Sequence, residues 1–246
     1  MSLFKLLFGR NDSGSDEQHP SVSEVFSQLD NLRRKASIAE IGEFPPPVDT
    51  LSSWFGGQAV MQHDEAVPQY KGKPMFPILQ IKISELPYVP KELNGTALLV
   101  VWLNQDEVPF DQPNGEGWLI REYTNLEKLR LVPDLTKPSN LKTLPIKWSI
   151  SETEGPGWEE AWGLVDLHSV NASEEAADEF FTKYTSHHGT KVGGYPTQIQ
   201  HELIGNASYV FQIGSEKKAN WMWVDNGIAY FLKNESGDWE FECQFY

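Results

Sequence analysis

Two glutamines inside apolar runs are the polar side chains best placed to do chemistry. Gln80 lies in the run FPILQIKI (76–83), and Gln212 lies in YVFQI (209–213). A buried amide must be hydrogen-bonded, because each unmade bond costs about 1–3 kcal/mol. We favour the interpretation that each amide satisfies backbone groups of a neighbouring turn. The alternative is that both amides point into a shared cleft and hold a ligand.

Glycine pairs are the second candidate feature. Gly193-Gly194 belongs to KVGGYPTQIQ, and an earlier segment, SSWFGGQA, carries the pair Gly56-Gly57. Consecutive backbone N–H groups of this kind could bind an anion. Turns that require positive φ explain the same pairs, and we favour turns.

Two tryptophans supply a third candidate contact. Trp221 and Trp223 alternate along an expected strand, so they share a face that could stack on a sugar or a peptide, unless they pack in the core. The candidate ligand-binding residues are therefore Gln80, Gln212, Trp221, Trp223, Asp225, Gly193 and Gly194.

Motifs of known catalysts are missing from the sequence. It contains no nucleophile elbow, P-loop, dinucleotide fingerprint or zincin motif, so the catalytic residues, if any, are unknown. An enzyme hypothesis would place a site in a groove between two halves of the chain. Its candidate groups are Gln80, Gln212, His188 and Asp225.

The six histidines are scattered, and His187-His188 is the only adjacent pair. His201 and Glu202 follow nearby, so a metal site is conceivable. Adjacent residues on a helix point apart, however, and a surface helix end is the simpler interpretation. We expect no metal site and no cofactor.

Charge and cysteine content restrict the partners and the compartment. The net charge is −15, from 35 acidic and 20 basic residues, which disfavours nucleic acid and allows either a basic protein partner or a small ligand. The excess of acids also explains solubility by itself. Cys243 is the single cysteine, so we expect no internal disulfide and a reducing, cytoplasmic location.

The N-terminal region predicts a tail and then a helix. No apolar run is long enough to cross a bilayer, but residues 1–10 (MSLFKLLFGR) could touch a membrane surface or the protein body. Residues 1–20 predict a flexible tail and linker. Ser21 and Glu24 form a capping box, and apolar residues follow at helical spacing, so we expect an amphipathic helix over 21–44.

Strand patterns fill two β-rich halves, 51–150 and 191–246. Residues 151–190 connect them; positions 151–182 hold nine acids and no Lys or Arg. We expect one helix there, capped at Asn171 and stopped by Gly189. The expected strands are 76–83, 97–103, 118–123, 142–150, 209–213, 220–224, 227–232 and 239–246.

The halves repeat short motifs, which predicts an internal duplication. The segment around Gln80 matches that around Gln212 at an offset of 132 residues, and Gly95-Thr-Ala matches Gly227-Ile-Ala at the same offset. The glycine pairs lie 137 residues apart. The expected fold is α+β and predominantly β, with two related halves packed as one unit, an N-terminal helix and one helix between the halves.

The motifs resemble those of the YwqG-like family of bacterial proteins of unknown function. They are Ser53-Trp-Phe-Gly-Gly57, the strand around Gln80, the segment 191–200, and Trp221-x-Trp-x-Asp-x-Gly227. The resemblance implies a duplicated, β-rich α+β fold and carries over no activity, cofactor or catalytic residue. In the first half Gln58-Ala59 follows the glycines where the family pattern has a proline-containing turn.

These observations favour a soluble, non-enzymatic binding or protein-interaction module with an acidic surface. The alternative is an enzyme of unrecognised type with its site in the groove between the two repeats. A third hypothesis is a peripheral membrane role through residues 1–10.

Overall fold

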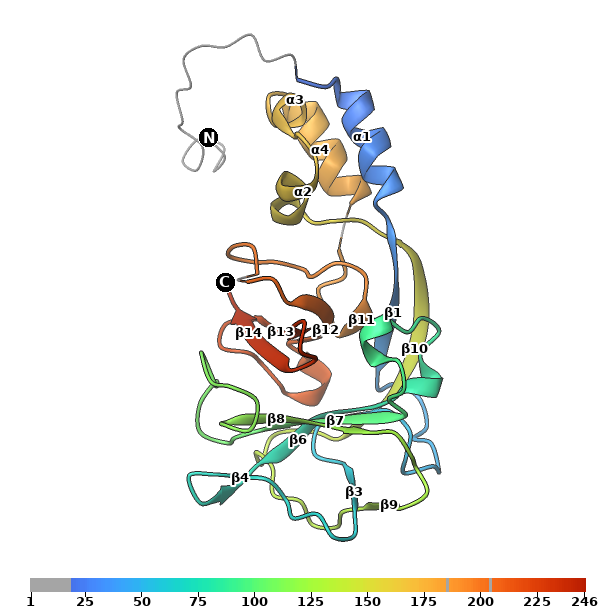
Figure 1. Cartoon of the computed structure of the whole chain (residues 1–246), viewed down its shortest axis with the longest axis vertical. Coiled ribbons are helices and arrows are strands. Elements are labelled where there is room, and N and C mark those ends of the chain that lie inside the picture. The colour runs from blue at the N-terminus through green and yellow to red at the C-terminus, as the bar shows by residue number, and fades with distance from the viewer. Residues whose placement is uncertain (1–18, 185, 204) are drawn as a thin grey trace.

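The computed structural model describes residues 19–184, 186–203 and 205–246. The expectations for residues 1–10, and most of the expected linker, lie outside these ranges. Among the described residues, no helix combines the length and the apolar character needed to cross a bilayer. The four α-helices of the described chain gather at one end of the molecule, and strands make up most of the rest (Figure 1).

One ten-stranded antiparallel sheet dominates the structure, in the order β14-β13-β12-β11-β1-β10-β2-β6-β7-β8. We call β2 and β6–β8 the first sheet half, and β11–β14 the second sheet half; β1 and β10 lie between them. The strands are β1 (Arg34–Ile41), β2 (Trp54–Phe55), β6 (Phe76–Lys82), β7 (Leu98–Leu103), β8 (Trp118–Tyr123), β10 (Leu144–Glu154), β11 (Lys191–Gly193), β12 (Ser208–Gly214), β13 (Ile228–Lys233) and β14 (Trp239–Gln244).

Small elements complete the chain around this sheet. Two ribbons pair β3 (Val60–Gln62) with β9 (Leu129–Leu131), and β4 (Gln69–Tyr70) with β5 (Lys73–Pro74). Short 3₁₀ helices cover Ile83–Glu85, Lys91–Leu93 and Lys217–Ala219.

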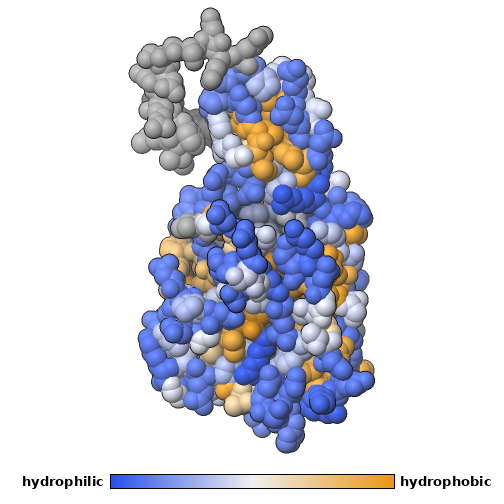
Figure 2. All heavy atoms as spheres, in the orientation of Figure 1, coloured by the Kyte–Doolittle hydropathy of each residue, from blue (hydrophilic) through white to orange (hydrophobic). Residues whose placement is uncertain are grey.

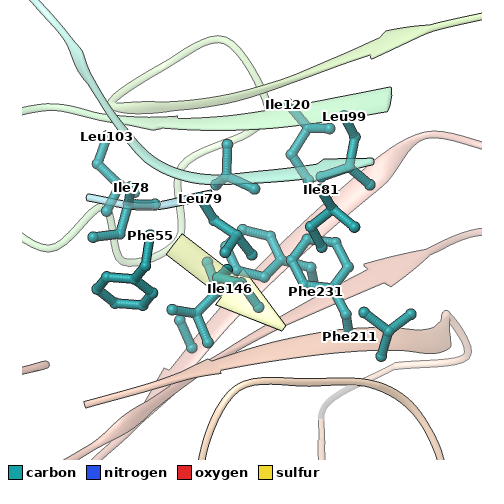
Figure 3. Close-up of a cluster of buried hydrophobic side chains, with 14 of the residues drawn as sticks. Phe55, Ile78, Leu79, Ile81, Leu99, Leu103, Ile120, Ile146, Phe211 and Phe231 are labelled. Carbon is teal, nitrogen blue, oxygen red and sulfur yellow. The ribbon is translucent and has the colours of Figure 1, made fainter. Parts of the chain in front are cut away.

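The two sheet halves fold toward each other and share one core. Side chains of β6, β7 and β8 point at Phe211 of β12 and Phe231 of β13 (Figure 3). The Trp118 ring of β8 contacts the rings of Phe231 and Phe241, with centroids 5.9 and 5.5 Å apart. The edge strands meet as well, because Trp239 Nε1 of β14 donates to a Glu122 carboxylate of β8 at 3.0 Å. The sheet is therefore nearly closed.

Continuous apolar sequence explains why the inner strands of both halves form where predicted. β7 is buried at every position and β6 at all but its last, so both faces of these strands are covered. The expected strands 76–83, 97–103, 118–123, 142–150, 209–213, 227–232 and 239–246 are confirmed, with end shifts of up to four residues.

The expected helix over 21–44 is wrong in its second part. Helix α1 (Val22–Asn31) begins at the predicted Ser21–Glu24 capping box and is capped at its end by Leu32. Residues 34–41 instead form β1, which pairs with β10 and β11 at the centre of the sheet. Pairing with a neighbouring strand on each side fixes this segment as a strand, which tertiary contacts decide and local propensity does not.

The single helix expected between the halves is also wrong. Three helices occupy this region: α2 (Trp158–Leu164), α3 (His168–Asn171) and α4 (Glu174–Lys183). They pack with α1 into a separate apolar cluster at the end of the molecule (Figure 1). The cap of α4 is Ser173, whose Oγ accepts from Ala176 N, and not Asn171. The helix ends before Tyr184, so Gly189 does not stop it.

The strand expected over 220–224 does not form. Asn220, Val224 and Asn226 all have positive φ, which breaks an extended run. A single bridge between Glu216 and Trp221 is all that remains of the ladder.

Candidate functional site

Gln80 is fully buried, and its whole amide is used by the backbone of its own sheet half. Its Oε1 accepts from Val60 N at 2.9 Å. Its Nε2 donates to Thr50 O at 3.0 Å and to Ser52 O at 2.7 Å. The amide therefore holds together the loops that flank β2.

Gln212 is also fully buried and makes the matching backbone bonds in the second sheet half, with two further bonds to the hydroxyls of Tyr209 and Thr197. Its Oε1 accepts from Thr197 N at 2.9 Å. Its Nε2 donates to His187 O at 3.0 Å and to Gly189 O at 2.9 Å. Neither amide lines any of the cavities described below, so the turn interpretation fits both and the shared cleft does not.

The strands that carry the two amides have matching irregularities. The register of β6 against β7 shifts between Pro77 and Leu79, and that of β12 against β13 shifts between Tyr209 and Phe211. These shifts lie at the offset of 132 residues that also relates the two glutamines. The partner strands are related by a smaller offset, because Val100 of β7 pairs with Gln80 and Tyr230 of β13 pairs with Gln212. The match of Gly95 with Gly227 is thus two residues out of register.

The four glycines of the two pairs all have positive φ, between 71° and 79°. Gly56 N and Gly57 N donate to backbone carbonyls of β6 at 2.8 and 2.7 Å, and Gly194 N donates to Lys35 O at 2.9 Å. These N–H groups are not presented to an anion. The turn interpretation explains the glycine pairs.

A buried ion pair lies next to the second glycine pair. Lys191 is fully buried, Glu154 is 4% exposed, and Lys191 Nζ donates to a carboxylate oxygen of Glu154 and, at 2.7 Å, to Ser186 Oγ. Burial lowers the pKa of Lys191 to about 8, against the opposing effect of Glu154. The equivalent position opposite Gln80 is Trp54, so the two halves differ here.

Three cavities follow one another where the β7–β8 loop of the first sheet half meets the second sheet half, with volumes of about 200, 290 and 610 Å³. We call them together the inter-half groove. Residues 103–114 of that loop line all three in turn. From the second sheet half come residues 221–223, 234, 238–243 and 245.

Aromatic and apolar side chains make up much of the inter-half groove. The Trp221 ring packs against those of Phe76 and Trp223, with centroids 5.8 and 5.0 Å apart. Trp223 is 1% exposed and belongs to the core, whereas Met222 is 61% exposed. Core packing therefore accounts for Trp223, and Trp221 is partly available on the groove wall.

The polar lining of the inter-half groove is acidic. Its carboxylates come from both halves, and its described lining contains no Lys or Arg. Lys71 and Lys73 reach the rim from outside and bind Glu107 and Asp106 at 2.9 Å. A hydrogen bond from Lys71 lowers the pKa of Glu107, which keeps that carboxylate charged. The acidic lining residues are Asp106, Glu107, Asp111, Asp238, Glu240 and Glu242.

The remaining predicted site residues are dispersed. Asp225 is exposed in the turn before β13, where its carbonyl accepts from Tyr246 N at 3.2 Å. His187 and His188 lie beyond the end of α4, and burial lowers the pKa of each. His201 lines the groove, 3.7 Å from Glu242. The groove lining from 103–114 was missed because its sequence carries only turn signals.

Comparison with known proteins identifies a matching family. The model of a family described as "Domain of unknown function (DUF1963)" matches residues 53–237, which include the first sheet half and β11–β13 of the second, but not β14. No curated protein matches the chain.

Proposed function

The chain belongs to the DUF1963 family, whose function is unknown, and we propose that it is a non-enzymatic binding protein whose inter-half groove takes a basic segment of a protein partner. The observation that carries this proposal is the charge of the groove. Six carboxylates and no Lys or Arg line its three cavities within the described residues. The net charge of −15 extends the same attraction over the whole molecule.

Aromatic surface beside these carboxylates suits the same partner. Lys and Arg carry apolar stems that pack on rings while their charged ends reach acids. Phe110, at 45% exposure, lies beside Phe245 with ring centroids 6.2 Å apart, and Met222 is the most exposed apolar side chain of the groove. Met side chains adapt to varied partners. A segment that alternates basic and apolar residues would use both parts of the lining.

The groove is proposed to owe its position to an internal duplication. The matching backbone hydrogen bonds of Gln80 and Gln212 support a common origin of the two sheet halves. The order of strands, read outward from the central β1 and β10, is also alike on the two sides. The resemblance to the YwqG-like family of bacterial proteins and a cytoplasmic location belong to the same proposal; the buried, unpaired Cys243 supports the latter.

Peptide selection tests the proposal directly. A random peptide library is panned against the full chain at low salt, and the selected peptides are measured by fluorescence anisotropy against two variants. Met222→Lys adds a cation to the groove and removes apolar surface. Ile150→Lys makes the same change at a 43%-exposed position on β10, outside the groove.

The expected peptides combine Lys or Arg with aromatic or aliphatic residues. Their affinity should fall with rising salt and drop about tenfold or more for Met222→Lys, which corresponds to about 1.4 kcal/mol. Ile150→Lys should bind like the wild type. Failure of the library to enrich, or equal loss in both variants, would contradict the proposal.

A further inference from the structure

Three side chains that are distant in the sequence meet at the helical end of the molecule. His19 Nδ1 lies 2.8 Å from Asp166 Oδ2, and His168 Nδ1 lies 2.7 Å from Asp166 Oδ1. The two imidazole rings stack with centroids 4.3 Å apart and an interplanar angle of 17°. One ligand atom from each residue falls within 4.8 Å of the others.

Local structure fixes each of the three side chains. His19 precedes Pro20, which restricts its backbone to extended conformations, and Ser21 then anchors the chain as the N-cap of α1. Asp166 accepts from the backbone N–H of His168 at 3.0 Å, at the start of α3. The His168 ring is further held by an edge contact with Trp162, with centroids 5.2 Å apart. The three groups are therefore held together before any ligand arrives.

The chemistry of this set is that of a metal site with an open position. Two imidazole nitrogens and one carboxylate oxygen are the ligand types that zinc, nickel and copper accept, and three protein ligands leave room for water. The side chains are 37–60% exposed, so an ion can reach them.

We propose that His19, Asp166 and His168 bind a divalent transition-metal ion that ties the chain before α1 to the corner between α2 and α3. The ion replaces the shared protons between the carboxylate and the two rings. This joins residues 147 apart and stabilises the cluster formed by α1 to α4. This proposed metal site differs from the expectation of no metal site, which considered only the histidines near 187–201.

Cobalt provides the probe, because its ligand-field absorption reports coordination by protein groups. The full chain, without a histidine tag and freed of metal with a chelator, is titrated with Co²⁺ and then with Zn²⁺, followed by visible absorption and calorimetry. His19→Ala and His168→Ala each remove one ligand. His63→Ala removes an exposed histidine elsewhere and is the matched control.

The expected result is one equivalent of Co²⁺ with a visible band that Zn²⁺ displaces, and a melting temperature raised by Zn²⁺. The affinity should fall about tenfold or more in His19→Ala and in His168→Ala, and stay unchanged in His63→Ala. Absence of the band in the wild type, or unchanged affinity in His19→Ala and His168→Ala, would overturn the proposal. Circular dichroism of the variants shows that a loss of binding is not a loss of fold.

Discussion

Replacing Gln212 by Leu should destabilise the protein strongly, and replacing Gln80 by Leu should do so to the same extent. Leu fits the volume of Gln but removes three hydrogen bonds to backbone groups of the second sheet half. Thr197 N and Gly189 O lose their side-chain partner, and His187 O keeps only the bond from Thr197 Oγ1. At about 1 kcal/mol for each group, the lower end of the usual range, the loss is about 3 kcal/mol. For a chain of this length that lowers the melting temperature by about 6–12 °C.

Thermal and urea unfolding of both variants measure this loss. Gln28→Leu, at an exposed position on α1, is the control and should melt like the wild type. Gln80→Leu orphans the matching groups in the first sheet half, so its loss should agree with that of Gln212→Leu within about 1 kcal/mol. If either glutamine variant unfolds like Gln28→Leu, the amides do not hold the turns and the reasoning is refuted.

Two further predictions concern the neighbourhood of these networks. Lys191→Met leaves the buried Glu154 carboxylate without its counter-ion and should lower the free energy of unfolding by about 3–5 kcal/mol. Adding Glu154→Leu should recover most of this loss, and a double variant as unstable as the single one would refute the prediction. Burial lowers the pKa of Lys191 to about 8, so between about pH 8 and 10.5 the unfolded chain binds more protons than the folded one. The free energy of unfolding should therefore rise with pH in that window, and more in the wild type than in Lys191→Met. Gly56→Ala and Gly193→Ala should destabilise more than Gly72→Ala. All three glycines have positive φ, but they differ in the space around an added Cβ. That atom would meet others at 2.4 Å at Gly56 and 2.6 Å at Gly193, and none at Gly72. Equal losses of stability in urea unfolding would count against the close approach.

The sequence predicted most strands of the fold because their signal is local. Runs such as 97–103 are apolar at every position, and their short length favours a strand buried on both faces. β1 was missed because its place depends on β10 and β11, which lie more than 100 residues away. The expected helix over 21–44 followed the pattern of 22–31 too far, since no breaker residue marks its end.

The polar candidates also divide into residues that a local sequence pattern reveals and residues that it does not. Gln80 and Gln212 were singled out because a polar residue in an apolar run needs a specific partner, and the partners are backbone groups of nearby loops. The inter-half groove is built by the β7–β8 loop against the second sheet half, an approach that no local pattern encodes. His19, Asp166 and His168 likewise carry no motif spacing.

Apolar surface outside the groove was not anticipated either. Figure 2 shows a mainly hydrophilic face on which apolar areas are separate, one over the helical cluster and others over the sheet. Phe181 of α4, at 46% exposure, stacks on Trp158 of α2 within the helical cluster. The inter-half groove differs from these areas because carboxylates lie beside its apolar side chains.

The binding site itself is tested most directly by hydrogen exchange of the full chain with and without a selected basic, apolar peptide. Slower exchange is expected within 104–114 and 221–225 and around the C-terminal residues 241–246, with the helical cluster unchanged. Protection confined to other segments, or none at saturating peptide, would contradict the assignment of the inter-half groove as the binding site.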